Sequence, residues 1–310
     1  MISTEVRRLI DMLMPRSSNA MHRGNMFNQD IKIDLRMVQE TLMLPLWARA
    51  IETEKNNPIV YDPYAKEIVE SIDYDFSQIE ESHMADHQGV WAIRAYNFDN
   101  IIEAFLENNS RAVVLNIGAG LDTTFQRVDQ GTVLWVNIDL PDVIAIRQKL
   151  IRHQLIPESE REMEIAKSIF DFTWIDDISR WTKDRSILFM AAGVLMYFEA
   201  QEVEILFRKL AETYPSAHVI FDSMSWLPAW GSNREIKKVV KNGEIDSSAM
   251  IKWHLKRASG LHKWVDTIKT VEEYPMLSKV PARNYFNKKQ MWQIKIVGLF
   301  RFYNMIHVQL

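Results

Sequence analysis

Short apolar runs separated by helical stretches dominate the middle of the chain. The runs cover residues 112–118, 132–140, 186–193 and 218–224, with a weaker one at 164–169. Uninterrupted apolar runs of this length are typical of strands that are covered on both faces of a parallel sheet. The alternation predicts a doubly wound, mostly parallel α/β sheet whose ligand lies at the carboxyl ends of the strands.

The stretches between these runs have helical signals of their own. Residues 141–151 begin with Pro141 and Asp142, which both favour the first turn of a helix. In residues 199–214 the apolar positions fall at helical spacing and form one stripe, made of Val203, Leu206, Phe207 and Leu210.

The end of the chain has a different period. Residues 301–310 alternate, so that Phe302, Ile306, Val308 and Leu310 share one face. Together with residues 266–274 they predict a closing pair of strands, with an antiparallel strand at the C-terminus.

These patterns divide the chain into regions. Residues 1–25 are expected to be a flexible arm, and residues 26–310 a single domain. Within it, residues 26–110 form a helical N-terminal cap, 111–224 the core that binds the ligand, and 266–310 the closing strands. Residues 225–265 hold four tryptophans and are either a lid over an apolar substrate or a helix pair packed on the core.

Composition narrows the class of protein. The chain has 310 residues, 47% of them hydrophobic and 25% charged, with a formal net charge of −4 and no cysteine. Disulfides and thiolate metal sites are therefore excluded. The N-terminus lacks the apolar core of a signal peptide and no window is apolar enough to span a bilayer, so we expect a cytoplasmic protein without a membrane partner. The net charge and the absence of base-binding motifs argue against nucleic acid.

The first apolar run leads into a glycine turn, "GAGLDT" at 118–123. Such a turn frees backbone N–H groups and lets a ligand approach the main chain. Gly118 and Gly120 form a G-x-G, but Thr123 stands where a dinucleotide fingerprint has its third glycine, and no phosphate-binding Gly-Lys-Ser/Thr follows. Asp139 ends the next run, where a carboxylate can accept both hydroxyls of a ribose; alternatively it caps the helix that begins at Pro141.

A ribose-binding carboxylate without a phosphate-binding fingerprint favours S-adenosylmethionine as the cofactor. Two other functions remain open. An NAD-dependent oxidoreductase would use the same turn and Asp139, although Thr123 argues against it. A non-catalytic protein could have kept the cofactor-binding fold.

Four successive segments resemble one known family. They are "VVLNIGAGLDTTFQRV", "WVNIDLPDVIAIRQKL", "SIFDFTWID" and "FMAAGVLMYFEAQEV", and they look like the ordered motifs of the leucine carboxyl methyltransferase family. The likeness is greatest to its bacterial branch, which includes the tetracenomycin-type polyketide O-methyltransferases. The resemblance implies a Rossmann-like class I methyltransferase fold and a small-molecule O-methyltransferase, with a carboxylate as one candidate acceptor.

The resemblance also implies a set of cofactor-binding positions. Arg94 matches the arginine that binds the cofactor's methionine carboxylate, Asp139 the ribose ligand, and Asp171 with Phe172 the acidic–apolar pair at the adenine. The whole set that it assigns to the cofactor is Arg94, Gly118, Gly120, Asp122, Asp139, Asp171, Phe172 and position 192.

Two positions depart from the pattern or stay ambiguous. Many relatives have a glutamate after the fourth strand, whereas this chain has Ala192, which cannot make the same polar contact. Tyr197 matches a tyrosine near the acceptor and is the one catalytic candidate, but it can equally be a packed aromatic at the start of a helix. Arg49 is a weaker candidate for the cofactor region, since a solvated arginine on a helix face is the better explanation of it.

Arg94 has a physical argument of its own. It shares a helical face with Phe98, Ile101 and Phe105, so its guanidinium should point inward. A buried guanidinium needs an anion, which is either the cofactor's carboxylate or a carboxylate of the protein.

No metal site is expected. His83 and His87 are spaced to share a helical face, but no third ligand lies near them in the sequence. His254 and His262 could be a base, a substrate contact or neither. The oligomeric state stays open.

Overall fold

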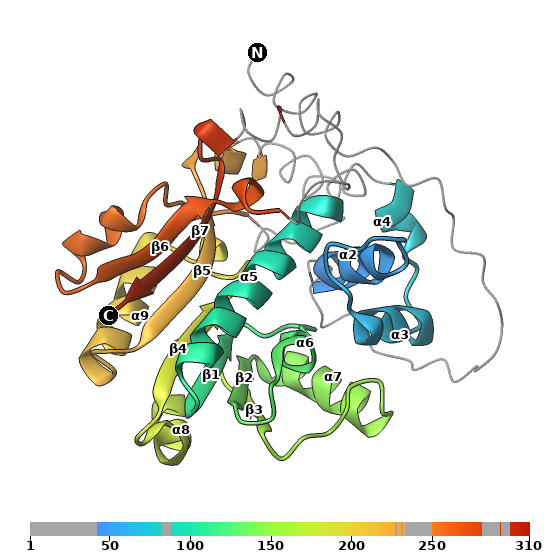
Figure 1. The fold of residues 1–310 in the computed structure, drawn as a ribbon, viewed down its shortest axis with the longest axis horizontal. Helices are drawn as coiled ribbons and strands as arrows, with labels where there is room; N and C mark the ends of the chain where they lie inside the picture. Colours follow the sequence, from blue (N-terminus) through green and yellow to red (C-terminus); the bar gives the residue numbers. More distant parts are fainter. Residues whose placement is uncertain are drawn as a thin grey trace.

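A seven-stranded mixed sheet forms the centre of the protein (Figure 1). The structure is a computed structural model, and it describes residues 42–81, 88–226, 228–230, 232–233, 250–280, 292 and 298–310. The expected N-terminal arm, His83 and His87 therefore lie outside the described residues. The strand order is β3-β2-β1-β4-β5-β7-β6.

The first five strands are parallel, as the apolar runs predict. They are β1 (Ala112–Ile117), β2 (Leu134–Asp139), β3 (Glu162–Ala166), β4 (Ser186–Ala191) and β5 (His218–Met224). β1 pairs with β2 on one side and with β4 on the other. The strand order reverses there, and the crevice beside such a reversal is where ligands of doubly wound sheets bind. The predicted third strand was placed slightly too late, because Glu162 and Glu164 point to a buried arginine and the strand ends before Lys167.

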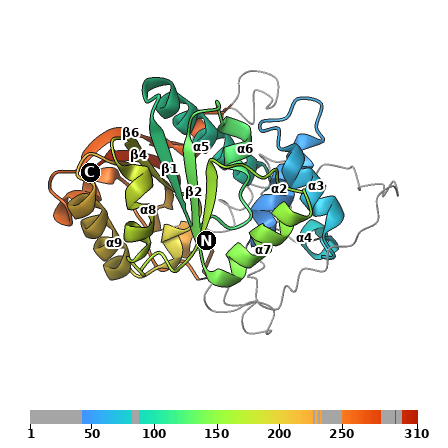
Figure 2. The ribbon, with the colours of Figure 1, turned by 90° about the horizontal axis from the view of Figure 1, so that it is seen from below.

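Helices cover both faces of the parallel strands (Figure 2). α5 (Gln88–Asn108) and α6 (Thr124–Val128) pack on one face, where Phe98, Ile101 and Phe105 are buried against β1 and β4 as predicted. α8 (Trp174–Thr182) and α9 (Ala200–Thr213) pack on the other face. The predicted stripe of α9 is buried there in full. Alternate residues of β1, β2, β4 and β5 thus contribute to two apolar layers.

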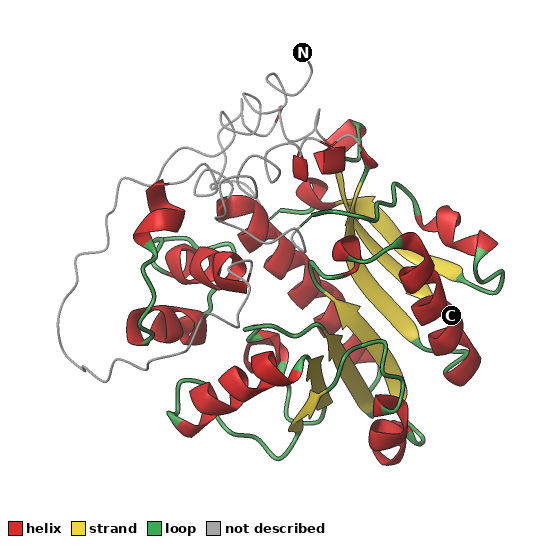
Figure 3. Ribbon diagram, turned by 180° about the vertical axis from the view of Figure 1, so that it is seen from behind, coloured by secondary structure: helices red, strands yellow, loops and turns green. Residues whose placement is uncertain are grey.

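The first helices of the predicted cap stand beside the sheet, whereas its last helix, α5, packs on the sheet. α2 (Met43–Thr53), α3 (Pro63–Ser71) and α4 (Ser77–Glu81) precede α5 in the chain. α2 and α3 share a separate apolar cluster with α7 (Pro141–Arg152), the crossover helix that follows β2 (Figure 3). The cap therefore packs against the glycine-turn end of the core, and Leu121 of the turn belongs to the same cluster.

The C-terminal strands confirm the predicted antiparallel closure. β7 (Tyr303–Gln309) pairs antiparallel with β5, and β6 (Lys269–Pro275) forms the edge of the sheet. One detail of the prediction was wrong: Phe302 lies in the opposite apolar layer from Ile306 and Val308, because the strand begins only after it. Short 3₁₀ turns complete the described part: η4 (Leu195–Tyr197), η6 (Ala258–Lys263) and η7 (Met276–Ser278).

Candidate functional site

The glycine turn lies where β1 ends, beside the end of β2. Gly118 and Gly120 have φ of 66° and 52°, a left-handed backbone that favours glycine. The N–H groups of Gly118 and Ala119 both donate to the carbonyl of Ile138, at 2.8 and 3.3 Å. Gly120 donates its N–H to the Asp139 carboxylate at 2.7 Å. The prediction that this turn offers free N–H groups was therefore wrong for these three residues, since neighbouring β2 satisfies them.

Asp139 is the last residue of β2, and its carboxylate contacts both the glycine turn and the start of the segment that follows β2. One carboxylate oxygen accepts from Gly120, and the other accepts from the N–H of Leu140 at 2.7 Å. Leu140, not Asp139, is the N-cap of α7, so the helix-cap interpretation was wrong. Burial raises the pKa of Asp139 despite these two hydrogen bonds. Each oxygen keeps a lone pair for a further donor, such as a ribose hydroxyl.

Arg94 reaches the same edge of the sheet from α5. Its Nη1 lies 3.7 Å from the Oδ2 of Asp222, a residue of β5, and the Arg94 side chain is 16% exposed. Within the described part of the chain, the guanidinium donates no hydrogen bond to a protein acceptor. Arg94 therefore has a carboxylate for charge balance while its donors stay uncommitted.

Gly193 makes room for this guanidinium. A Cβ on Gly193 would lie 2.2 Å from Arg94 Nη1, and the residue has a φ of 72°. Its N–H donates to Asp222 Oδ1 at 2.5 Å. A side chain on Gly118 would likewise meet both methyl groups of Val194, at 2.7 Å. The two glycines thus leave space at the ends of β1 and β4 for the side chains of Val194 and Arg94.

Sequence reasoning missed Gly193 and Asp222. Signals were available: a glycine directly after an apolar strand, and an acidic residue inside the otherwise apolar run 218–224. Asp222 is 8% exposed, and burial raises its pKa in spite of the nearby Arg94.

Three further arginines donate hydrogen bonds to residues of the glycine turn. They are Arg49, Arg127 and Arg147. Arg147 is fully buried, donates to the carbonyls of Gly120 and Asp122, and pairs with two glutamates of β3. Arg127 donates to both oxygens of Asp99.

The interpretation of Arg49 as a solvated arginine was wrong. The residue is 5% exposed, pairs with Asp62 at 2.8 Å and donates to the carbonyl of Leu121 at 3.0 Å. The buried Asp62 carboxylate balances the charge of Arg49. The same carboxylate pairs with Arg127 and accepts a hydrogen bond from the hydroxyl of Thr123. Through these hydrogen bonds, Arg49 links the cap helices to the glycine turn.

Asp122 belongs to this supporting network. Its carboxylate accepts from the amide of Asn116 at 3.1 Å and from the hydroxyl of Thr124 at 2.9 Å. Asn116 is buried and also donates to Asn137 of β2. These contacts fix the shape of the turn from inside.

The loop after β3 carries Asp171 and Phe172 to the same edge of the sheet as Asp139. Asp171 is exposed and accepts from the N–H and the hydroxyl of Thr173, and these hydrogen bonds lower its pKa. The Phe172 ring is partly buried against the apolar layer under α8 and α9. A nucleobase can bind such a pair, because the exposed carboxylate accepts a hydrogen bond from the edge of the nucleobase while the ring packs on its face.

The segment after β4 brings Ala192 and Tyr197 to the site. Ala192 is half-buried beside the apolar layer under α5 and directly precedes Gly193. Tyr197 is partly buried and packs against a small cluster of Met196, Ala229 and Ile251. Burial raises the pKa of Tyr197, while Arg94 and Asp222 influence it in opposite directions. Its phenol therefore stays neutral at physiological pH.

The remaining candidates lie elsewhere. His254 and His262 are exposed. Trp253 and Trp264 stack on each other, with centroids 5.9 Å apart, in the layer under α9, whereas Trp226 and Trp230 are exposed. The described residues hold no group of three or more side chains suited to a metal ion. None of the described helices combines the length and apolar character needed to cross a bilayer.

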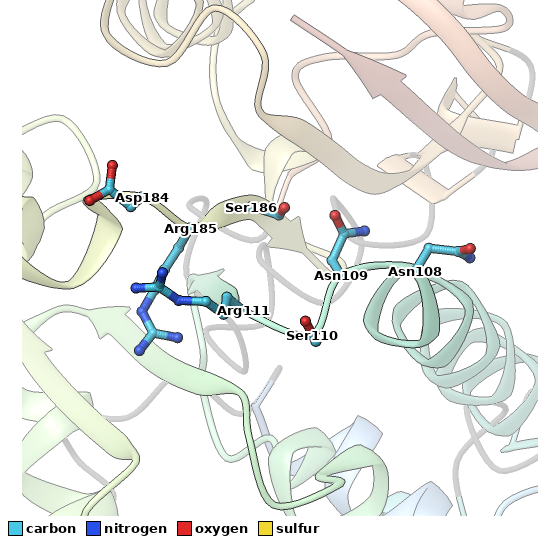
Figure 4. A pocket seen from close by; sticks show the side chains of 7 residues that line it. All are labelled: Asn108, Asn109, Ser110, Arg111, Asp184, Arg185 and Ser186. Carbon is cyan, nitrogen blue, oxygen red and sulfur yellow. The ribbon is translucent and has the colours of Figure 1, made fainter.

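A polar depression lies at the opposite edge of the sheet (Figure 4). Its lining includes Arg111 and Arg185, together with residues 108–110 at the end of α5. It is located at the amino ends of β1 and β4. It is thus separate from the carboxyl ends, where doubly wound sheets bind their ligands.

Comparison with known proteins gives a consistent picture. The family described as leucine carboxyl methyltransferase matches residues 43–211, more than half of the chain. The chain is 29% identical over 247 residues to the tetracenomycin polyketide synthesis O-methyltransferase TcmP of Streptomyces glaucescens, covering 79% of this chain and 85% of that protein. It is 30% identical over 196 residues to the S-adenosyl-L-methionine-dependent methyltransferase dpfgK of Gibberella zeae, covering 61% and 65%.

A solved structure is similar in fold. A DUF574 family protein from Streptomyces avermitilis superimposes with a TM-score of 0.51 at 16% identity, covering 87% of this chain and 97% of that chain.

Proposed function

The chain belongs to the leucine carboxyl methyltransferase family and is an S-adenosylmethionine-dependent O-methyltransferase, and we propose that it methylates a small apolar molecule at a carboxylate. The doubly wound sheet, closed by antiparallel β7, is the class I methyltransferase fold. The relatives that it resembles support a place in polyketide biosynthesis.

One observation carries the choice of cofactor. The N–H groups of Gly118, Ala119 and Gly120 all bind acceptors on β2. A dinucleotide needs such N–H groups for its pyrophosphate. A turn in which these three successive N–H groups are already bonded, next to a carboxylate for ribose, suits a nucleoside without phosphate. This arrangement disfavours the NAD-dependent alternative.

The residues present fit S-adenosylmethionine along its length. Arg94 would bind the methionine carboxylate, because its donors are uncommitted and Gly193 leaves it space. Asp139 would accept the ribose hydroxyls, and Asp171 with Phe172 would take the adenine. These four assignments are part of the proposal.

When bound, the cofactor supplies a methyl group on a sulfonium, whose leaving group needs no proton. The protein therefore contributes by alignment and exclusion of water. Tyr197 has a neutral phenol, whose pKa burial raises further above its ordinary value, and this phenol can donate a hydrogen bond that orients the acceptor but is too weakly basic to take its proton. The apolar cluster of Met196, Ala229 and Ile251 would contact the apolar part of the acceptor. Trp226 and Trp230, exposed on the segment after β5, would form part of a lid.

A carboxylate acceptor fits this environment because it is already ionised and needs no general base. Among the described residues, the histidines at 254 and 262 are exposed, and Asp222 is engaged by Arg94 and Gly193. A phenol or alcohol acceptor would need a base that these residues do not supply.

Binding is tested first. Calorimetry should detect S-adenosylhomocysteine and no NAD; the reverse would overturn the cofactor assignment. If the cofactor binds but no acceptor is methylated, the non-catalytic alternative gains support.

The acceptor is then tested with two matched compounds, naphthoic acid and naphthol, and labelled S-adenosylmethionine. A carboxylate acceptor yields an ester, which alkali hydrolyses, and its rate is flat above neutral pH. An ether product that resists alkali, formed faster as the pH approaches the pKa of the phenol, would refute the carboxylate assignment.

A further inference from the structure

Asp222 connects two parts of the cofactor site. Its Oδ1 accepts the N–H of Gly193 at 2.5 Å, while its Oδ2 faces Arg94 Nη1 at 3.7 Å. It is buried within β5, which pairs with β4 on one side and β7 on the other. The carboxylate thus binds the loop that makes space for the guanidinium and faces the guanidinium itself.

The Arg94 pair differs from the other arginine pairs of the cap and turn. Arg49 and Arg127 each donate to a carboxylate oxygen at 2.8 Å, and Arg147 is likewise hydrogen-bonded to its glutamates. Each of those guanidinium groups donates from all three of its nitrogens to acceptors of the protein. The Arg94–Asp222 distance is longer than a hydrogen bond. It leaves the donors of Arg94 free while the opposite charge keeps the guanidinium near the sheet edge.

We propose that Asp222 is a positioning residue for the cofactor, one that holds Arg94 and the Gly193 loop in the geometry that receives the methionine carboxylate. The inference rests on the proposed function. Asp222 acts through Arg94 and does not touch the cofactor. Rigid support of this kind sets the geometry of a binding residue.

This role gives a specific expectation. Without the charge at 222, the guanidinium loses the group that orients it, and only ligands that use Arg94 suffer. A purely structural role in β5 would instead weaken every ligand of the site equally, because the whole strand end would shift.

The chain offers a matched control. Like Asp222, Asp129 faces an arginine and accepts a glycine N–H: it pairs with Arg161 at 2.5 Å and accepts from Gly131 at 2.9 Å. It differs in that Arg161 is hydrogen-bonded to both of its oxygens. Asp129 lies in the turn between α6 and β2, at the amino end of the strand. Asp129→Asn therefore removes a carboxylate that pairs with an arginine and a glycine, but away from the site.

The experiment measures dissociation constants of S-adenosylhomocysteine and its decarboxylated analogue by calorimetry. Asp222→Asn should weaken the first by about tenfold, the lower end of what an outer-shell partner contributes at metal sites, and the second by less than about twofold. Asp129→Asn should change neither. In an Arg94→Met background, Asp222→Asn should have no further effect on either ligand.

The outcomes are distinguishable. If the wild-type protein does not bind S-adenosylhomocysteine, the proposed function fails. If wild type binds and Asp222→Asn binds equally well, or loses both ligands in parallel, the positioning role is overturned while the function stands. Tighter binding by Asp222→Asn would show that Asp222 competes with the cofactor, which also contradicts the proposal.

Discussion

Gly193→Ala offers a sharp test of the space around Arg94. The added Cβ would lie 2.2 Å from Nη1, well inside van der Waals contact, so the guanidinium must move. Hydrogen bonds to charged groups contribute about 1.5–3 kcal/mol, so losing the one from Arg94 to the cofactor carboxylate should weaken S-adenosylhomocysteine by about 10- to 100-fold. The left-handed φ of 72° adds a separate cost to folding, about 1–2 kcal/mol for alanine.

Gly131→Ala separates these two effects. Gly131 also has a positive φ, of 90°, but nothing lies within 4 Å of its Cβ position. Both variants should lose similar stability in urea unfolding, whereas only Gly193→Ala should lose affinity in calorimetry. The decarboxylated analogue should bind Gly193→Ala nearly as well as wild type. Equal S-adenosylhomocysteine affinity in the two variants would refute the role of this contact.

Three other variants address neighbouring claims. Asp139→Asn, which keeps one acceptor for Gly120, should weaken S-adenosylhomocysteine by at least about 1.5 kcal/mol in calorimetry; a change in stability alone would mean that Asp139 only holds the turn. Ala192→Glu should fold and alter cofactor affinity, because Ala192 is half-buried beside Gly193; a loss of several kcal/mol in unfolding experiments would place it in packed core instead. Burial, together with the neighbouring His218, lowers the pKa of His307 from 6.5 to about 4. The unfolded chain therefore binds more protons between these values, and stability present above pH 6.5 is lost as the pH falls towards 4. His307→Gln should flatten that part of the stability profile, and an unchanged slope would contradict the assignment to this residue.

The strands β1, β2, β4 and β5 were predictable because they are buried on both faces, and such strands consist mostly of apolar residues. The apolar run at 218–224 coincides with β5. Arg94 was predictable for the same reason, since a charge on the otherwise apolar face of α5 demands a partner.

What the sequence could not show was the pairing of charges that lie far apart along the chain. Asp62 is a helix-capping residue by its sequence, yet it also joins Arg49 and Arg127 beneath the turn. Asp222 meets Arg94 only because β5 lies beside β4 at the end of the site. The sequence also could not show that N–H groups of the turn are hydrogen-bonded, because this depends on how closely β2 approaches the turn.

The central claim is that the cofactor's carboxylate binds Arg94 while its ribose binds Asp139. A crystal structure of the protein with S-adenosylhomocysteine tests it most directly. We expect the carboxylate within hydrogen-bond distance of the Arg94 guanidinium and both ribose hydroxyls on the Asp139 carboxylate. A ligand whose carboxylate binds another cation, or whose ribose lies away from β2, would contradict it.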